Sequence, residues 1–165
     1  IQKNMIFKTF WRKKENKSDI KSEIEIKTDI FKYRTDLEMR FTDLDMMGHV
    51  NNAMYFTYME MARTKYWQQT IHWDWKKTGV VIGKAENTYI KPLHLGDKIS
   101  VYVRTSRIGN TSFDLEYIIV KTINGEEVIC SKGKTVCVVY DYESKRPVQI
   151  PDKERTKMIA FEQLT

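Results

Sequence analysis

The sequence predicts an α+β domain in which one long helix packs against a largely antiparallel sheet of five strands. Residues 52–69 carry apolar and aromatic side chains at three- and four-residue spacing, which indicates an amphipathic helix on the order of 27 Å long. Elsewhere, segments with alternating or β-branched side chains are separated by turn-forming residues, as expected for strands. These segments are residues 33–41, 80–90, 98–107, 112–122 and 127–140.

Turn dipeptides and prolines set the limits of the predicted strands. Pro92 ends the second strand and Gly109-Asn110 follows the third. Asn124-Gly125 lies between the fourth and fifth strands, and this dipeptide is typical of a type I′ hairpin turn. The order therefore predicts four strands after the helix, which form a largely antiparallel sheet with residues 33–41. A short closing helix is expected after residue 150, because a proline there is followed by acidic and then apolar residues.

The domain is expected to span residues 31–165, preceded by a basic N-terminal extension over residues 1–30. That extension is rich in lysine and lacks a sustained apolar period, so we expect it to be flexible. The whole chain has 165 residues, 41% of them hydrophobic, which suits one globular domain. No segment approaches the ~20 apolar residues of a membrane span, and no signal peptide is recognisable. We therefore expect a cytoplasmic protein without stable membrane insertion.

Charge and the few metal-ligating residues narrow the choice of partners. The net charge of +6 suits an anionic partner. Nucleic acid would fit, but much of the excess lies in residues 8–17, so no nucleic-acid partner is expected. The three histidines are not at metal-ligand spacing with other ligands, so we expect no metal or other cofactor. Cys130 and Cys137 are expected to be reduced core residues, on opposite faces of their strand by alternation.

The most informative segment is residues 43–52, Asp-Leu-Asp-Met-Met-Gly-His-Val-Asn-Asn. It joins the first predicted strand to the long helix, so acidic, imidazole and amide side chains lie beside a helix N-terminus. Unpaired backbone N–H groups and the positive end of the helix dipole face that position. This combination is suited to chemistry on a carbonyl group.

The string from Thr42 to Arg63 resembles the signature of hotdog-fold acyl thioesterases, both the 4-hydroxybenzoyl-CoA thioesterase type and the plant acyl-ACP thioesterases. The order of elements agrees over roughly residues 33–163. The resemblance implies a hotdog fold, in which the sheet wraps the helix and protomers pair through edge strands, with sites at the interface. We therefore expect a homodimer or homotetramer, paired through residues 98–107 or a neighbouring strand.

The resemblance implies roles for three residues of the corner. Asp45, the second acidic residue of the Asp-x-Asp pair, would be the catalytic carboxylate, acting as a nucleophile or as a general base. The backbone N–H of Asn52 would polarise the thioester carbonyl. His49 would orient Asp45 or a water molecule, as a similar histidine does in the plant enzymes, or be a structural residue at the helix start. Asp43 is expected to anchor the turn.

Four further residues are candidates for substrate binding or catalysis, and each of them also has a possible structural role. Asn51 could contact substrate or cap the helix. Tyr55 and Tyr58 could line an acyl pocket or belong to the core. Glu60 is a reserve catalytic carboxylate, since another hotdog branch uses a helix-borne glutamate; the alternative is an ion pair with Arg63.

The resemblance thus implies an acyl-CoA thioesterase of fatty acid metabolism, with acyl-ACP as the alternative substrate, that releases a carboxylic acid and a free thiol; the phosphates of coenzyme A or an acidic carrier protein would suit the positive net charge. Two alternatives remain open. One is a non-catalytic acyl-CoA binding module that has kept the fold. The other is a hotdog dehydratase or hydratase using His49 as its base.

Overall fold

A computed structural model describes residues 28–76 and 78–164 of the chain. Its elements, in order, are β1 (Tyr33–Leu37), the 3-10 turn η1 (Phe41–Asp43), α2 (Asn52–Tyr66), the π-turn η2 (Trp67–Ile71), β2 (Gly79–Tyr89), β3 (Lys98–Ile108), β4 (Ser112–Ile123), β5 (Glu126–Asp141), β6 (Arg146–Pro147) and α3 (Asp152–Glu162). In this described part, no helix is both long enough and apolar enough to cross a membrane.

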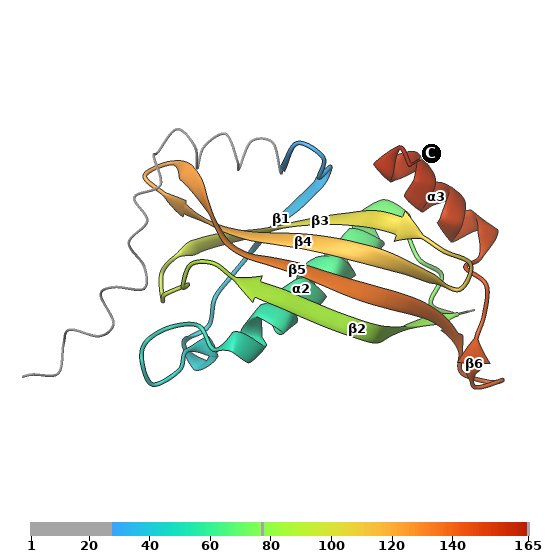
Figure 1. The fold of residues 1–165 in the computed structure, drawn as a ribbon, viewed down its shortest axis with the longest axis horizontal. Coiled ribbons are helices and arrows are strands. Elements are labelled where there is room, and N and C mark those ends of the chain that lie inside the picture. Colours follow the sequence, from blue (N-terminus) through green and yellow to red (C-terminus); the bar gives the residue numbers. More distant parts are fainter. Residues whose placement is uncertain (1–27, 77, 165) are drawn as a thin grey trace, which may run out of the picture.

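The strands form one curled antiparallel sheet in the order β1-β3-β4-β5-β2, with the two-residue β6 paired to the end of β5. Figure 1 shows α2 crossing one face of this sheet obliquely, while α3 lies beside the far ends of the strands. One long helix wrapped by an antiparallel sheet is the hotdog fold. The predicted fold class is therefore confirmed.

The main core lies between α2 and the concave face of the sheet. The helix buries Tyr55, Tyr58, Met59, Ala62 and Tyr66. These residues have the three- and four-residue spacing from which the helix was predicted. Full burial of one large apolar side chain contributes about 1.5–3 kcal/mol, so this stripe, rather than intrinsic helix propensity, holds α2 in place.

The first strand is shorter than expected and the chain turns before Phe41. Arg40 and Asp43 cause this turn: the backbone N–H of Arg40 donates to Asp43 Oδ2 at 3.0 Å, and Arg40 Nε donates to Oδ1 at 3.0 Å. These bonds close a 3-10 turn in place of further extended chain. Phe41, the last residue of the predicted strand, is 77% exposed.

The long helix also ends differently from the prediction, which gave one helix over residues 52–69. Regular α-helix stops at Tyr66 and a π-turn continues to Ile71. The turn is closed by His72, which adopts a left-handed conformation with φ of 52°. The Thr70 hydroxyl donates back to the Tyr66 carbonyl, and such back-bonding favours local distortion of a helix.

A bulge in β5 overturns the expected placement of the cysteines. The register slips between Ile119 and Val120 of β4, so Cys130 is an extra residue opposite that pair. A bulge of this kind shifts the alternation of side chains by one. Cys130 and Cys137 are both free and buried, as expected, but both pack in the main core rather than on opposite faces.

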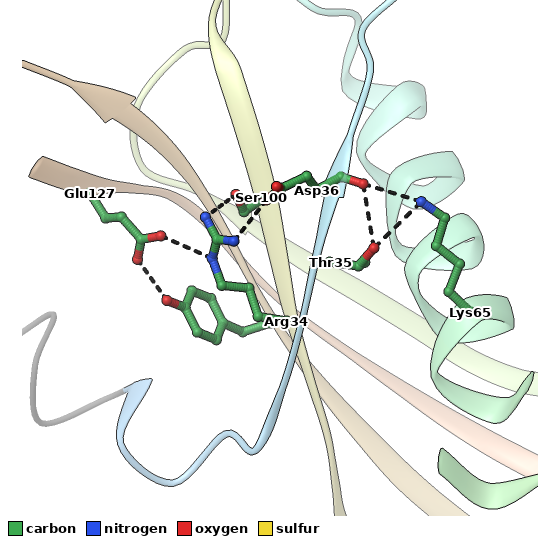
Figure 2. Close-up of polar contacts among 7 residues, drawn as sticks. Arg34, Thr35, Asp36, Lys65, Ser100 and Glu127 are labelled. Atoms are coloured by element: carbon green, nitrogen blue, oxygen red, sulfur yellow. Dashed lines mark hydrogen bonds and ion pairs between the residues drawn. The ribbon is translucent and has the colours of Figure 1, made fainter. Parts of the chain in front are cut away.

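Strand β3 lies inside the sheet, between β1 and β4, so of the two predicted pairing edges, residues 98–107 or a neighbouring strand, the first is wrong. The strands at the two edges are β1 and β2. Figure 2 shows how side chains tie β1 down: Arg34 donates to Ser100 on β3 at 2.7 Å and to Glu127 on β5 at 3.1 Å. Lys65 on α2 reaches the Asp36 carbonyl at 3.2 Å. Of the two edge strands, β2 is the longer, with 11 residues against 5 in β1.

Candidate active site

The corner between η1 and α2 is built on one buried carboxylate, that of Asp43. This residue is 1% exposed and accepts hydrogen bonds from Arg40 and from the Tyr58 hydroxyl, the latter at 2.8 Å. Burial alone would raise the pKa of Asp43, but these hydrogen bonds outweigh it and hold the pKa below its usual value. The backbone carbonyl of Asp43 also accepts from the Asn51 N–H at 2.9 Å. Asp43 thus joins both ends of the corner, as expected of an anchor.

Asp45 lies at the exposed tip of the corner. Its Oδ1 accepts from the backbone N–H groups of Met47 at 2.8 Å and His49 at 3.1 Å, and its own N–H donates to the His49 carbonyl at 2.7 Å. Gly48, with φ of +77°, makes this tight turn possible. Within the described residues, Asp45 Oδ2 has no hydrogen-bond partner. The fold therefore fixes the carboxylate through one oxygen and leaves the other accessible.

The helix N-terminus that follows presents one unpaired donor. Asn51 is the N-cap residue, and its side-chain Oδ1 accepts from the Ala53 N–H at 3.0 Å, so the capping alternative for Asn51 is confirmed. The Asn52 N–H forms no hydrogen bond within the described part of the chain. The Asn52 carbonyl accepts from the Tyr89 hydroxyl at 3.0 Å. Strand β2 thereby holds the first turn of α2.

His49 meets Asp45 through the main chain, whereas its imidazole packs on a second histidine. The rings of His49 and His94 meet edge to face with their centroids 4.9 Å apart, and their backbones form an isolated β-bridge. His94 in turn lies 3.8 Å from a carboxylate oxygen of Asp97. No hydrogen bond joins the imidazole of His49 to Asp45 within the described residues.

The two tyrosines of α2 nearest the corner are core residues. Tyr55 is 3% exposed and packs edge to face on Tyr89 with the ring centroids 5.0 Å apart. Burial raises the pKa of Tyr55 to about 12. Tyr58 is engaged with Asp43, and burial together with that carboxylate raises its pKa. Both are neutral, structural groups near neutral pH.

Glu60 is exposed on α2, about two turns beyond the corner. The alternative interaction expected for it, an ion pair with Arg63, is not formed among the described residues. The Arg63 guanidinium is buried instead, with Nη1 3.3 Å from the Tyr117 hydroxyl and Cζ 5.4 Å from the centre of the Trp67 ring.

Two features of the site were missed by the sequence reasoning. Tyr89 closes on the helix N-terminus from a strand far along the chain, and only the antiparallel pairing of β2 brings it there. In addition, Phe41, Met46 and Met47 are largely exposed and make the rim of the corner apolar. In the residues that the structure describes, no group of three or more His, Cys, Asp or Glu could hold a metal ion.

Residues 39–158 match the model of the thioesterase-like superfamily. The chain belongs to this superfamily. The superfamily match covers the whole corner, α2 and the sheet from β2 to β5, and it assigns the protein to the enzymes that hydrolyse thioesters. The resemblance seen in the sequence is thereby confirmed.

The chain is also similar to individual thioesterases. The chain is 31% identical to the acyl-acyl carrier protein thioesterase ATL3, chloroplastic, of Arabidopsis thaliana over 133 residues, which is 78% of this chain and 68% of that protein. A thioesterase from Thermus thermophilus, solved with coenzyme A and Zn, is 36% identical with a TM-score of 0.70 over 82% of this chain and 97% of that one. A thioesterase superfamily member from Jannaschia, 21% identical with a TM-score of 0.75, shares the fold over 86% of this chain and 92% of its own.

Proposed function

We propose that the protein hydrolyses an acyl-CoA thioester to a carboxylic acid and free coenzyme A, with acyl-carrier protein as the alternative thiol carrier. The observation that carries the proposal is the pairing of two unused groups at one corner. Asp45 offers a carboxylate oxygen that the turn leaves free, and Asn52 offers a backbone N–H at the positive end of α2. Thioester hydrolysis requires one group of each kind.

In this proposal the Asn52 N–H donates to the thioester carbonyl oxygen and stabilises the negative charge that forms there. Backbone donors of this type need no reorganisation during the reaction, and losing one typically costs ~10²–10³ in rate. The helix dipole adds to the effect. The donor is held in place because Asn51 caps α2 and Tyr89 binds the carbonyl of the same residue.

Asp45 can act by either of two balanced routes. As a nucleophile, its free oxygen attacks the carbonyl carbon, the C–S bond breaks, the thiolate leaves and takes a proton, and water hydrolyses the resulting anhydride. As a general base, it takes a proton from a water molecule that attacks the same carbon, and the thiolate again leaves and is protonated. The anchoring of Oδ1 by two N–H groups suits both routes, since it fixes the direction of the free oxygen.

The remaining site residues have lesser roles in this scheme. His49 is adjacent to Asp45 and can position the attacking water. Glu60, exposed on α2, is the reserve catalytic carboxylate. The buried positions of Tyr55 and Tyr58 make them supports of the corner. Asn51 acts through the cap.

We further propose that the enzyme is a homodimer or homotetramer assembled through β2. This strand forms an edge of the sheet, and residues 82–86 at its centre are exposed. An unpaired strand of that length is a template for pairing with another chain, and a two-fold axis across it would extend the sheet through both protomers.

The experiment is hydrolysis of a panel of short, long, branched and aromatic acyl-CoAs, followed by release of free thiol. Turnover of at least one member by the wild-type protein, and its loss in Asp45→Asn, would support the proposal. Binding of acyl-CoA without thiol release across the panel would instead favour the non-catalytic binding module. Hydration of an enoyl-CoA without thiol release would favour the hydratase.

A further inference from the structure

Unsatisfied polar atoms are concentrated along one path between α2 and the sheet. In the described part of the chain, seven buried side-chain nitrogen and oxygen atoms have no hydrogen-bond partner. Five of the seven belong to four residues, which we call the polar lane: Arg63, Trp67, Asn87 and Ser131. Buried polar atoms in native proteins nearly always have a hydrogen-bond partner. Several unpaired atoms in one place therefore indicate that a ligand supplies their partners.

The pairing of the strands shows that these residues share one face. Asn87 of β2 is opposite Gly133 of β5, which is opposite Tyr117 of β4. Ser131 lies two residues from Gly133 and therefore points to the same side. A Cβ at position 133 would clash with the Met59 sulfur, so this side is the one that α2 covers.

The lane runs along α2 away from the catalytic corner. Tyr55, Met59, Arg63 and Trp67 follow one another at four-residue spacing and form one stripe of the helix. Tyr55 packs on Tyr89 beside the corner, whereas Trp67 packs on Phe113. The polar lane therefore begins near the thioester position and ends about three turns further along.

The far end of the lane is built to bind an anion. Arg63 is 8% exposed, carries a permanent positive charge, and has no carboxylate within ion-pair distance among residues 28–76 and 78–164. Its Nε and the Trp67 Nε1 are both donors without an acceptor, and neither group can accept a hydrogen bond. The Tyr117 hydroxyl beside Arg63 is engaged with Thr135 Oγ1 at 2.9 Å. A carboxylate would satisfy the charge and both donors.

We propose that the polar lane binds an acyl chain whose far end carries a carboxylate, which pairs with Arg63 and Trp67. This inference rests on the proposed function and names the substrate class: thioesters of dicarboxylic acids. Met59, a flexible side chain lying against Gly133, is the residue that must move to admit the chain. Arg63 lies eleven residues beyond Asn52 on α2, about 16 Å along its axis. Because the arginine side chain leans toward the helix N-terminus, an acyl chain on the order of 10 to 14 carbons would span the distance.

The test compares acyl-CoAs of equal length that end in a carboxylate or in a methyl group, from 6 to 16 carbons. For the wild-type enzyme, the ratio of kcat/KM for the carboxylate to that for the methyl compound should be roughly tenfold or more at the matching length. The ratio should fall by about tenfold in Arg63→Gln and by less in Arg63→Lys. The fall should come mainly from a higher KM for the carboxylate compound. Arg146→Gln on β6, an exposed arginine outside the lane, is the matched control and should keep the ratio. A wild-type ratio of one or less, or an unchanged ratio in Arg63→Gln, would overturn the inference.

Two further measurements keep the test decisive. If Arg63→Gln lacks a cooperative melt, Trp67→Phe removes only the indole donor, and an unchanged ratio in that variant would count against the proposal. If neither compound is hydrolysed, the proposed function fails, and calorimetry with dodecanedioyl-CoA and dodecanoyl-CoA replaces the kinetic comparison. Tighter binding of the first that is lost in Arg63→Gln would support the carboxylate site, and equal binding would exclude it.

Discussion

The Tyr58 hydroxyl, in the second turn of α2, donates to the buried carboxylate of Asp43 at 2.8 Å. This bond joins the middle of the helix to the turn that carries Asp45. Removing it in Tyr58→Phe leaves a buried acceptor with one partner fewer, which should lower the free energy of unfolding by about 1–3 kcal/mol. A domain of this size should lose roughly 2–4 °C in Tm per kcal/mol. Thermal melts will check this, and a Tm equal to that of the wild type would show that the bond is dispensable.

Replacement of Asp45 by asparagine should lower kcat by at least ~10², equivalent to about 2.7 kcal/mol of transition-state stabilisation. The new amide side chain keeps an oxygen that can accept from Met47 and His49, so the turn should persist; it can neither attack the carbonyl nor take a proton from water. Steady-state kinetics and a melting curve on the same sample are the measurements. Glu60→Gln is the matched control. Near-full turnover in Asp45→Asn with loss in Glu60→Gln would move the catalytic role to the helix carboxylate.

The lowered pKa of Asp43 predicts a specific dependence of stability on pH. The carboxylate binds its proton less readily in the folded than in the unfolded chain, so its stabilising contribution is complete above the unfolded pKa of about 4. It is lost as the pH falls below that value through the folded pKa. Denaturant unfolding between pH 3 and pH 7 should therefore show a decline in stability that is shallower in Asp43→Asn. Asp152→Asn, which removes an exposed carboxylate elsewhere in the fold, is the control for the loss of one acidic group.

Assembly through β2 predicts a dimer or larger oligomer in sedimentation equilibrium at micromolar concentration. Ala85→Lys places a charge on the exposed centre of the edge strand, a substitution of the kind that natural edges use to prevent pairing, and should shift the population toward monomer. Ser144→Lys, in the turn after β5, should not. A monomeric wild-type protein would refute the proposed assembly.

Deletion of residues 1–27 should leave the cooperative melt and the hydrolytic activity largely intact. Phe31, the first residue of the expected domain, packs edge to face on Tyr102, with the ring centroids 6.2 Å apart, in a small cluster on one face of the sheet. Phe31→Ala in the full chain should therefore be destabilising, whereas the deletion should not. A truncated protein without a cooperative transition would show that the segment belongs to the domain.

The elements that the sequence predicted well are those with a strong local signal. The spacing of Tyr55, Tyr58 and Met59 defines the buried stripe of α2, and Asn124-Gly125 marks the hairpin between β4 and β5. The departures depend on contacts or geometry that a periodic pattern does not encode. Arg40 and Asp43 close a turn where alternation predicted strand, and the extra residue Cys130 shifts the alternation within β5.

The candidate site divides in the same way. The corner and the capping role of Asn51 follow from short-range sequence, since the interacting groups lie within a few residues of one another. The contact of Tyr89 with Asn52, the stacking of His49 on His94 and the burial of Arg63 join distant segments. Each of these depends on strand order and register, which the sequence pattern alone did not specify.

The hydrogen bond from Tyr89 to the Asn52 carbonyl links the outer edge of the sheet to the amide proposed to receive the substrate oxygen. Docking of a second subunit along β2 would fix the position of Tyr89, and with it the orientation of that amide. Quaternary structure and turnover would then be coupled. Specific activity should decline on dilution below the dissociation constant of the oligomer, and Tyr89→Phe should weaken this concentration dependence while the sedimentation profile stays the same.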